Sequence, residues 1–402
     1  MWRFLSIYGI LALSHLFFQI ALAHREHINQ SKQGLPKIYP NVAIIIPSYN
    51  EEADNVISCI KSCLKQRYKK PIKIYFVDDG SKDKTAVNAL KKLNFKNVII
   101  MDNKDNRGKR EAQKCIFDIL PKEVEIIITV DSDARLEIDA IFKLVQQFSN
   151  KKIGAVTGNV SGTHTNLLSK LIDLRYYNAF NQEREAQSYF GTVLCCCGVL
   201  SAYRRDLVDK VKEDYVNQYF LGIKCTYGDD RNLTNRILNM GYLVKFAENA
   251  RATTSVPTKI KGWLKQQKRW NKSFYRELIF SIKMMFKQPR KLPAYIWYDM
   301  IMQTILPFML LISIGLMIFN TITNGIIFLL GYLAVLVGIG IVRGSYAYFR
   351  TKDKSFFMFP LYSFLHIGLL IPVRYYALAT LKDTSWGTRD FNKNKLRDYS
   401  KV

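Results

Sequence analysis

The chain has 402 residues, of which 49% are apolar, and a formal net charge of +26. Its Lys and Arg residues are scattered over the whole length, without a basic tail, zinc-finger spacing or basic zipper, so we expect no nucleic-acid partner. The seven cysteines include three adjacent ones and no Cys-x-x-Cys pair. This pattern excludes a disulfide framework or zinc knuckle and favours buried, reduced thiols.

The first hydrophobic stretch, Leu5–Ala23, is close to the roughly 20 residues that a membrane-spanning helix requires. Its end, Ala21-Leu22-Ala23, also resembles a signal-peptidase site, so a cleaved signal peptide is the alternative. Basic residues are more numerous after the stretch than before it. The positive-inside rule therefore predicts an uncleaved membrane anchor over residues 1–24, followed by a cytosolic region.

Residues 40–255 alternate between short apolar runs and amphipathic segments. The runs that we predict to be strands are Val42–Pro47, Ile72–Val77, Val98–Met101 and Glu125–Val130. Strands that alternate with helices of about a dozen residues predict an α/β domain with a mostly parallel sheet and helices on both faces. Ligands of such sheets bind beyond the carboxyl ends of the strands.

Two acidic pairs follow predicted strands at this edge. Asp78 and Asp79 suit hydrogen bonds to a uracil imide or a ribose hydroxyl, although an ordinary turn over Asp-Gly-Ser is the alternative. Asp131 and Asp133 are separated by one residue, and hard oxygen ligands of this kind hold Mg²⁺ or Mn²⁺ beside a diphosphate. We therefore expect metal binding at Asp133 and Asp131, and nucleotide contacts from Asp78, Asp79 and Asp131.

A third acidic pair, Asp229-Asp230, opens a predicted helix. One of these carboxylates suits the removal of a proton from an acceptor hydroxyl, although acidic residues also favour helix starts through the helix dipole. Lys109 and Arg110 are expected to contact phosphate, with a solvated charge cluster as the alternative. The five histidines suggest no Ser-His-Asp or Cys-His arrangement, so we expect no covalent intermediate.

The region after the α/β domain is basic and then hydrophobic. Residues 256–293 predict interfacial helices in which Arg269 suits a pyrophosphate and Trp270 suits a sugar ring, although a purely interfacial role also suits them. Residues 294–381 contain two spans, Ala294–Phe319 and Gly325–Val342, joined by the polar turn Asn320–Asn324. A further stretch, Phe356–Thr380, is interrupted by two prolines, and we expect it to be re-entrant or interfacial, which leaves the basic tail 382–402 in the cytosol.

Taken together, these motifs resemble those of processive, membrane-integrated family 2 glycosyltransferases with a GT-A fold. The resemblance extends from about Val42 to Arg389. It implies that Asp79 contacts the region of the nucleotide base and that Asp133 binds the metal with Asp131 nearby. It also implies that Asp230, with Asp229 beside it, is the catalytic base.

Two further motifs carry the same resemblance. Gln266, Arg269 and Trp270 correspond to a motif that contacts the donor diphosphate and the acceptor. Trp386-Gly387-Thr388-Arg389 resembles a gating loop that closes over the nucleotide in hyaluronan synthases, and implies nucleotide contacts from Trp386 and Arg389.

The motifs are shared between two relatives. Gly228–Arg231, Arg269–Phe274 and Trp386–Arg389 resemble hyaluronan synthases, whereas Cys195–Gly198 and the single N-terminal span resemble nodulation-type chitin-oligosaccharide synthases. The resemblance implies a multi-pass plasma-membrane enzyme with a cytosolic catalytic domain, which contacts membrane lipid and extends a growing glycan. We expect hyaluronan made from UDP-GlcNAc and UDP-glucuronate, with chitin-type or poly-GlcNAc synthesis from UDP-GlcNAc alone as the alternative. A non-processive lipid-linked glycosyltransferase and a non-enzymatic basic membrane scaffold remain as further alternatives.

Overall fold

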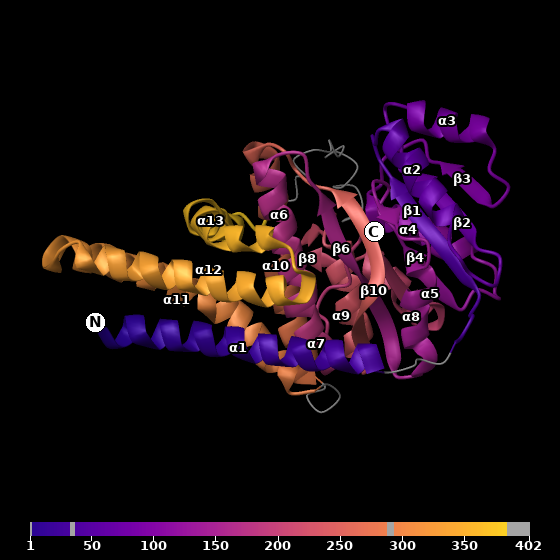
Figure 1. The fold of residues 1–402 in the computed structure, drawn as a ribbon. Coiled ribbons are helices and arrows are strands. Elements are labelled where there is room, and N and C mark those ends of the chain that lie inside the picture. The colour runs from indigo at the N-terminus through magenta and orange to yellow at the C-terminus, as the bar shows by residue number, and fades with distance from the viewer. Residues whose placement is uncertain (1, 33–36, 288–292, 384–402) are drawn as a thin grey trace.

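The protein is described by a computed structural model over residues 2–32, 37–287 and 293–383 (Figure 1). Its central sheet has eight strands in the order β3-β2-β1-β4-β7-β6-β10-β5. The strands are β1 (Val42–Ser48), β2 (Lys73–Asp78), β3 (Val98–Asp102), β4 (Ile126–Thr129), β5 (Arg135–Leu136), β6 (Ile153–Thr163), β7 (Ser201–Arg204) and β10 (Leu243–Ser255). Strands β8 (Tyr219–Phe220) and β9 (Ile223–Lys224) form a separate hairpin.

The sheet is mixed but mostly parallel, as predicted. Strands β3, β2, β1 and β4 pair in parallel, as do β6 and β10, whereas β7 and β5 pair antiparallel with their neighbours. Because β1, β2 and β4 are parallel, their carboxyl ends meet at one edge of the sheet. This edge receives Asp78 at the end of β2 and Asp131 shortly after β4.

Helices cover both faces of this sheet. They are α2 (Ala53–Leu64), α3 (Thr85–Leu93), α4 (Lys109–Ile119), α5 (Ala140–Val145), α6 (Leu167–Asn178), α7 (Glu185–Tyr189), α8 (Arg205–Val216) and α9 (Asp229–Asn239), with a short 3₁₀-helix η1 (Gln146–Ser149) and a π-helix η2 (Ala179–Arg184). Strand β1 is buried along its whole length because it has helices on either side.

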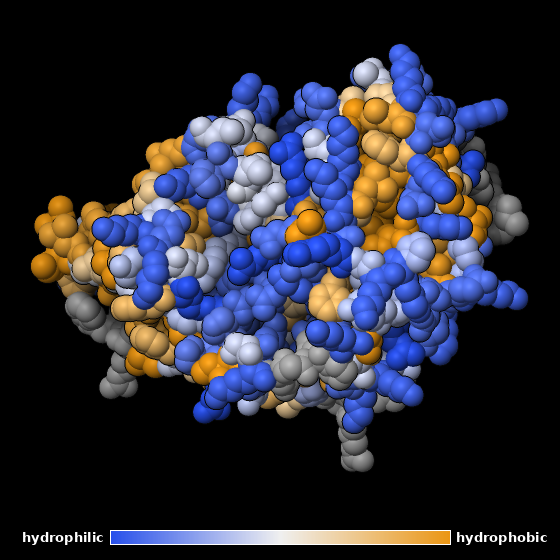
Figure 2. Space-filling model, turned by 45° about the vertical axis from the view of Figure 1, so that its right-hand side comes forward, coloured by the Kyte–Doolittle hydropathy of each residue, from blue (hydrophilic) through white to orange (hydrophobic). Residues whose placement is uncertain are grey.

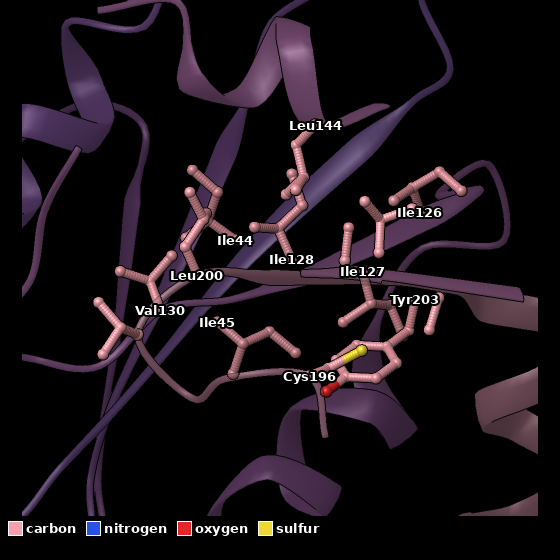
Figure 3. Close-up of a cluster of buried hydrophobic side chains, with 14 of the residues drawn as sticks. Ile44, Ile45, Ile126, Ile127, Ile128, Val130, Leu144, Cys196, Leu200 and Tyr203 are labelled. Carbon is pink, nitrogen blue, oxygen red and sulfur yellow. The ribbon is translucent and has the colours of Figure 1, made fainter. Parts of the chain in front are cut away.

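Figure 3 shows how alternate side chains of one strand reach the two faces. Ile44 and Ile45 are neighbours on β1 and are fully buried, yet they point to opposite sides of the sheet. Ile44 lies towards Leu144 of α5, while Ile45 lies towards Tyr203 and Cys196. Close packing of the core therefore fixes the distance between β2 and β4, the strands that lead into the acidic pairs.

The remaining helices are long and apolar, or amphipathic. They are α1 (Trp2–Lys32), α10 (Ile260–Lys287), α11 (Tyr295–Asn324), α12 (Ile327–Thr351), α13 (Phe359–Leu365) and α14 (Ile371–Ala379), with η3 (Lys354–Met358) and the π-helix η4 (His366–Leu370) around α13. Within the described residues, four helical segments are long and apolar enough to cross a membrane: Ile7–Lys32, Tyr295–Asn324, Ile327–Thr351 and Lys354–Ala379. Helices α11 and α12 project together from the α/β domain, and the projecting end is mostly hydrophobic (Figures 1 and 2).

The turn between α11 and α12 differs from the prediction. Residues Asn320–Asn324, which we predicted as a polar turn, instead form the last turn of α11, and the chain reverses at Gly325 and Ile326. The polar side chains satisfy themselves within the helix, since Asn320 Nδ2 and Thr321 Oγ1 donate to the carbonyls of Leu316 and Met317. A polar run is therefore compatible with continued helix.

The last hydrophobic segment is helical throughout, from η3 through α14, although Pro360 and Pro372 lie in it. Both prolines sit in the first turn of a helix, where their missing N–H groups are tolerated. Near its start, the ring of Phe356 lies 4.6 Å from that of Tyr177 in α6, and just after its end Asp383 pairs with α10. Both ends of the segment thus contact the half of the molecule that contains α6 and α10, which is what a re-entrant or interfacial path requires. That path remains a prediction.

A buried ionic cluster joins the membrane helices to the α/β domain. Arg350, near the end of α12, donates to Glu185 of α7, and its Nη2 lies 2.6 Å from Glu248 of β10. His27 of α1 completes the cluster, with Nδ1 2.6 Å from the Glu248 carboxylate. Because the Arg350 guanidinium contacts both acidic groups and His27 contacts one of them, the cluster fixes α1, α7, β10 and α12 to one another.

We predict that Arg350→Met destabilises the protein. The substitution leaves the buried Glu185 and Glu248 carboxylates without their cation, which costs about 3 kcal/mol of unfolding free energy. Denaturant unfolding in detergent, followed by fluorescence, measures the loss. The matched control is Lys91→Met, which removes an exposed pair with Asp102 and is expected to cost about 0.5 kcal/mol. Equal effects of the two substitutions would contradict a structural role for the cluster.

Candidate active site

The acidic pair after β4 and the acidic pair at α9 are joined by one lysine. Lys109 is the first residue of α4, and its Nζ lies 2.7 Å from Asp131 Oδ1 and 3.0 Å from Asp229 Oδ2. Burial by itself lowers the pKa of Lys109, but the two carboxylates outweigh it and raise the pKa well above the usual value. The lysine that we predicted to contact phosphate therefore also brings two predicted motifs to one place.

The side chains of Asp131 and Asp133 suit a divalent cation. Asp133 Oδ2 accepts a hydrogen bond of 3.0 Å from Thr254, and burial, followed by repulsion from Asp131, raises the pKa of Asp133 to about 6. A carboxylate whose charge is disfavoured by burial and by a neighbouring carboxylate fits a divalent ion with oxygen ligands. The backbone of Gly198 also lies close to the Asp131 carboxylate, because a Cβ added to this glycine would lie 3.0 Å from Asp131 Oδ2.

The first turn of α9 presents Asp229 and Asp230. Gly228 precedes them with a φ of +80°, and a Cβ at this position would collide with Ser273 of α10, so the close approach of α10 to this turn favours glycine. Burial alone raises the pKa of Asp229, but Lys109 overrides this effect and holds the pKa below its usual value. Burial and the Asp229 charge raise the pKa of Asp230. Asp230 is therefore the more basic carboxylate of the pair.

Two donors hold the Asp230 carboxylate. The backbone N–H of Arg231 donates to Oδ1 over 2.8 Å, and Cys195 Sγ donates to Oδ2 over 3.5 Å. Sequence analysis assigned no chemistry to the run Cys195–Cys197. The sequence signals were the adjacency of three cysteines and the resemblance of Cys195–Gly198 to chitin-oligosaccharide synthases, and neither indicated that one of the thiols would face this carboxylate.

Helix α10 carries the residues of the Arg-Trp motif. Trp270 is 42% exposed and its ring lies 6.2 Å from that of Tyr176, so the two rings form an aromatic surface. The Arg269 guanidinium lies within electrostatic reach of both acidic pairs. Gln266 Oε1 is buried and accepts no hydrogen bond from the part of the chain that the structure describes.

Three predicted contact residues already have protein partners. Asp78 accepts from Ser81 and Lys84, and Asp79 accepts from the backbone of Arg107 and Gly108, so both carboxylates stabilise the loops at the sheet edge. Arg110 is buried, and its Nη groups donate to Gln218 Oε1 and to the carbonyls of Tyr215, Tyr227 and Gly228. Arg110 thus braces the loop before Asp229. The nucleotide contacts of Asp78 and Asp79, and the phosphate contact of Arg110, remain predictions.

Trp386 and Arg389 lie outside the described residues. The chain that leads towards them is held at α10, since the Asp383 carboxylate lies 2.9 Å from Lys272 Nζ and the Asp383 carbonyl accepts from Tyr227 Oη over 3.1 Å. The Lys272 side chain is 2% exposed and that of Asp383 is 40% exposed, so the pair is buried on the lysine side only.

Comparison with known proteins gives the same assignment as the motifs. The profile of glycosyl transferase family 2 matches residues 43–212. A hyaluronan synthase of Streptococcus pyogenes is 38% identical over 394 residues, which cover 96% of this chain and 90% of the relative. This chain belongs to glycosyltransferase family 2. It is a hexosyltransferase of the hyaluronan-synthase-like kind, and its long apolar helices make it a membrane protein.

Two further similarities bear on the enzyme. An N-acetylglucosaminyltransferase of Azorhizobium caulinodans is 34% identical over 359 residues, covering 87% of this chain and 88% of the relative. The solved mannosyltransferase PcManGT from Pyrobaculum calidifontis, in complex with GDP-Man and Mn²⁺, has a TM-score of 0.60 at 18% identity and covers 90% of this chain and 98% of its own. The second similarity confirms the GT-A-type fold of the catalytic domain.

We predict that Asp230→Asn lowers the turnover of sugar transfer by about a thousandfold, because the amide cannot accept the acceptor's proton. Isothermal titration with UDP, beside a coupled assay of UDP release, measures binding and turnover separately. UDP affinity should stay near that of the wild type. Asp214→Asn, which changes an exposed carboxylate, is the control. Ordinary turnover by Asp230→Asn would rule out the base assignment.

Proposed function

We propose that this family 2 glycosyltransferase is a processive, inverting enzyme that makes hyaluronan from UDP-GlcNAc and UDP-glucuronate. The observation that carries the proposal is the meeting of both acidic pairs at Lys109, with the Arg-Trp motif of α10 within electrostatic reach. Donor, metal and base groups are then together at one edge of the sheet, next to the membrane helices.

The reaction is a single displacement. The acceptor hydroxyl oxygen attacks C1 of the donor sugar while Asp230 takes its proton, and the C1–O bond to the diphosphate breaks with its electron pair leaving on UDP. A raised pKa suits Asp230 for this role, and Asp229 stays ionised beside Lys109. Inversion needs one base and no nucleophile of the protein.

Asp133 and Asp131 would hold Mg²⁺ or Mn²⁺. When bound, such an ion neutralises the charge that develops on the diphosphate of the leaving UDP. A mannosyltransferase of the same fold was solved with GDP-Man and Mn²⁺, which supports a divalent cofactor here. Arg269 and Lys109 supply additional positive charge for the diphosphate, and Trp270 offers its ring to a sugar of the acceptor.

An arginine-rich region that extends from the neighbourhood of Asp230 to the membrane helices α12 and α14 favours an anionic product. Arg184 donates to the carbonyl of Cys195 beside the base, and the guanidinium groups of Arg231 and Arg374 both lie over the ring of Phe274.

Two more arginines of this region surround one glutamate. Arg175 pairs with Glu183 at 3.0 Å, and Arg343 of α12 lies within electrostatic reach of the same carboxylate. Such a surplus of cations suits a polymer that carries a carboxylate in each disaccharide.

The second candidate function is synthesis of a neutral GlcNAc polymer. The similarity to N-acetylglucosaminyltransferases at 34% identity favours it. Either polymer would leave through the membrane helices, and the basic segments that flank α11 and α12 support a cytosolic catalytic domain.

Product analysis tests the proposal. We predict that the purified protein in detergent with Mg²⁺ or Mn²⁺ forms polymer only when both UDP-GlcNAc and UDP-glucuronate are present, and that hyaluronidase degrades the polymer. Chitinase-sensitive oligomers from UDP-GlcNAc alone would support the second candidate. Short lipid-linked products would indicate a non-processive enzyme, and the absence of UDP release in all mixtures would indicate a scaffold.

We also predict that Trp386→Ala slows transfer and weakens UDP binding, because the tail that carries Trp386 starts from the Asp383 contacts at α10. Turnover and UDP titration measure the two effects. Phe391→Ala, a change in the same tail outside the Trp-Gly-Thr-Arg motif, is the control. Unchanged turnover and affinity in Trp386→Ala would exclude a gating role.

A further inference from the structure

We propose that Cys195 is a positioning residue of the active site, whose S–H group orients the Asp230 carboxylate for proton removal. The inference rests on the proposed role of Asp230 as the base. It assigns a role to Cys195, which the chemistry of sugar transfer by itself does not require.

The geometry restrains both oxygens of the base. Oδ1 of Asp230 accepts from the backbone of Arg231 at 2.8 Å, and Oδ2 accepts from Cys195 Sγ at 3.5 Å, which is an ordinary length for a bond from sulfur. A carboxylate held at one oxygen can still rotate about its Cβ–Cγ bond. A carboxylate held at both presents a lone pair in one direction, which favours attack from one acceptor position.

Cys195 is itself fixed to the helix that carries the base. Its carbonyl accepts from Arg184 Nε at 3.1 Å, and the next residue, Cys196, donates its backbone N–H to Thr234 Oγ1 at 2.9 Å. Thr234 in turn donates to the carbonyl of Asp230 at 2.7 Å. Segment 195–196 and the first turn of α9 therefore form one hydrogen-bonded unit.

The side chain of the neighbouring cysteine, Cys196, fixes this segment in the core. The Cys196 side chain is fully buried and lies beside Tyr203 and Ile45 in the core (Figure 3). Since Cys196 cannot leave the core without opening a cavity, Cys195 is held towards Asp230.

The thiol remains protonated and acts as a donor. Burial, followed by the charge of Asp230, raises the pKa of Cys195 far above its usual value. The group is thus neither a thiolate nucleophile nor a metal ligand in this environment. Its available chemistry is a weak hydrogen bond to the carboxylate.

The test compares variants that remove or replace the donor. Cys195→Ala and Cys195→Val abolish it with opposite changes in volume, whereas Cys195→Ser keeps a donor. We expect both apolar variants to lose turnover by about tenfold, with KM for the UDP-sugars and UDP affinity near those of the wild type. Cys195→Ser should regain most of the lost turnover. Cys115→Ala, at a half-buried thiol on α4, is the control and should match the wild type.

Several outcomes overturn the inference. Full turnover in Cys195→Ala would do so, as would equal loss in Cys195→Ser, or a loss confined to KM. If one apolar variant does not fold, as judged by its melting temperature, the turnover of the other is compared with that of Cys195→Ser. The proposed function fails separately, through an inactive wild type or an active Asp230→Asn, so the two failures are distinguishable.

Discussion

One buried ammonium group holds the site together. Lys109 bridges Asp131, which follows a strand, and Asp229, which opens a helix, and the side chains of Lys109 and Asp229 are largely shielded from water. Charges in such a place must be paired, because an isolated one would lose its hydration without compensation. The pairing draws the sheet edge and the start of α9 towards each other. The positions of Asp131 and of the Asp229-Asp230 pair both follow from this contact.

The same contact separates the roles of two adjacent carboxylates. Asp229 pairs with the lysine, which lowers the pKa of its carboxyl and keeps it ionised, whereas burial and the charge of Asp229 raise the pKa of Asp230. Identical side chains thus acquire different chemistry from their surroundings. A raised pKa makes Asp230 a stronger base, while Asp229 keeps Lys109 in place. The dipeptide works as a unit in which one residue supports the other.

The membrane half is attached by contacts of a similar kind. Arg350 joins α12 to Glu185 and Glu248, and Lys245 joins β10 to the buried Glu26 of α1. Both are ion pairs at the junction between apolar helices and the α/β domain. They fix the helices to the domain, and in the proposed reaction they would set the path from Asp230 towards the membrane. A glycan made at Asp230 would meet the arginine-rich region along this path.

Much of this arrangement was predictable from sequence. The apolar runs before Asp78 and Asp131 predicted buried strands, and the alternation with helices predicted the mostly parallel sheet, because burial on both faces leaves a local pattern. Because the acidic residues follow parallel strands, we predicted that they share one edge of the sheet. The polar residues 320–324 were misjudged as a turn, since their side chains bond within the helix. The tertiary structure alone decided that Lys109 bridges two motifs, that Arg110 braces a loop and that Cys195 faces Asp230. These contacts join residues far apart in the chain, and no local periodicity records which distant groups a buried charge will meet.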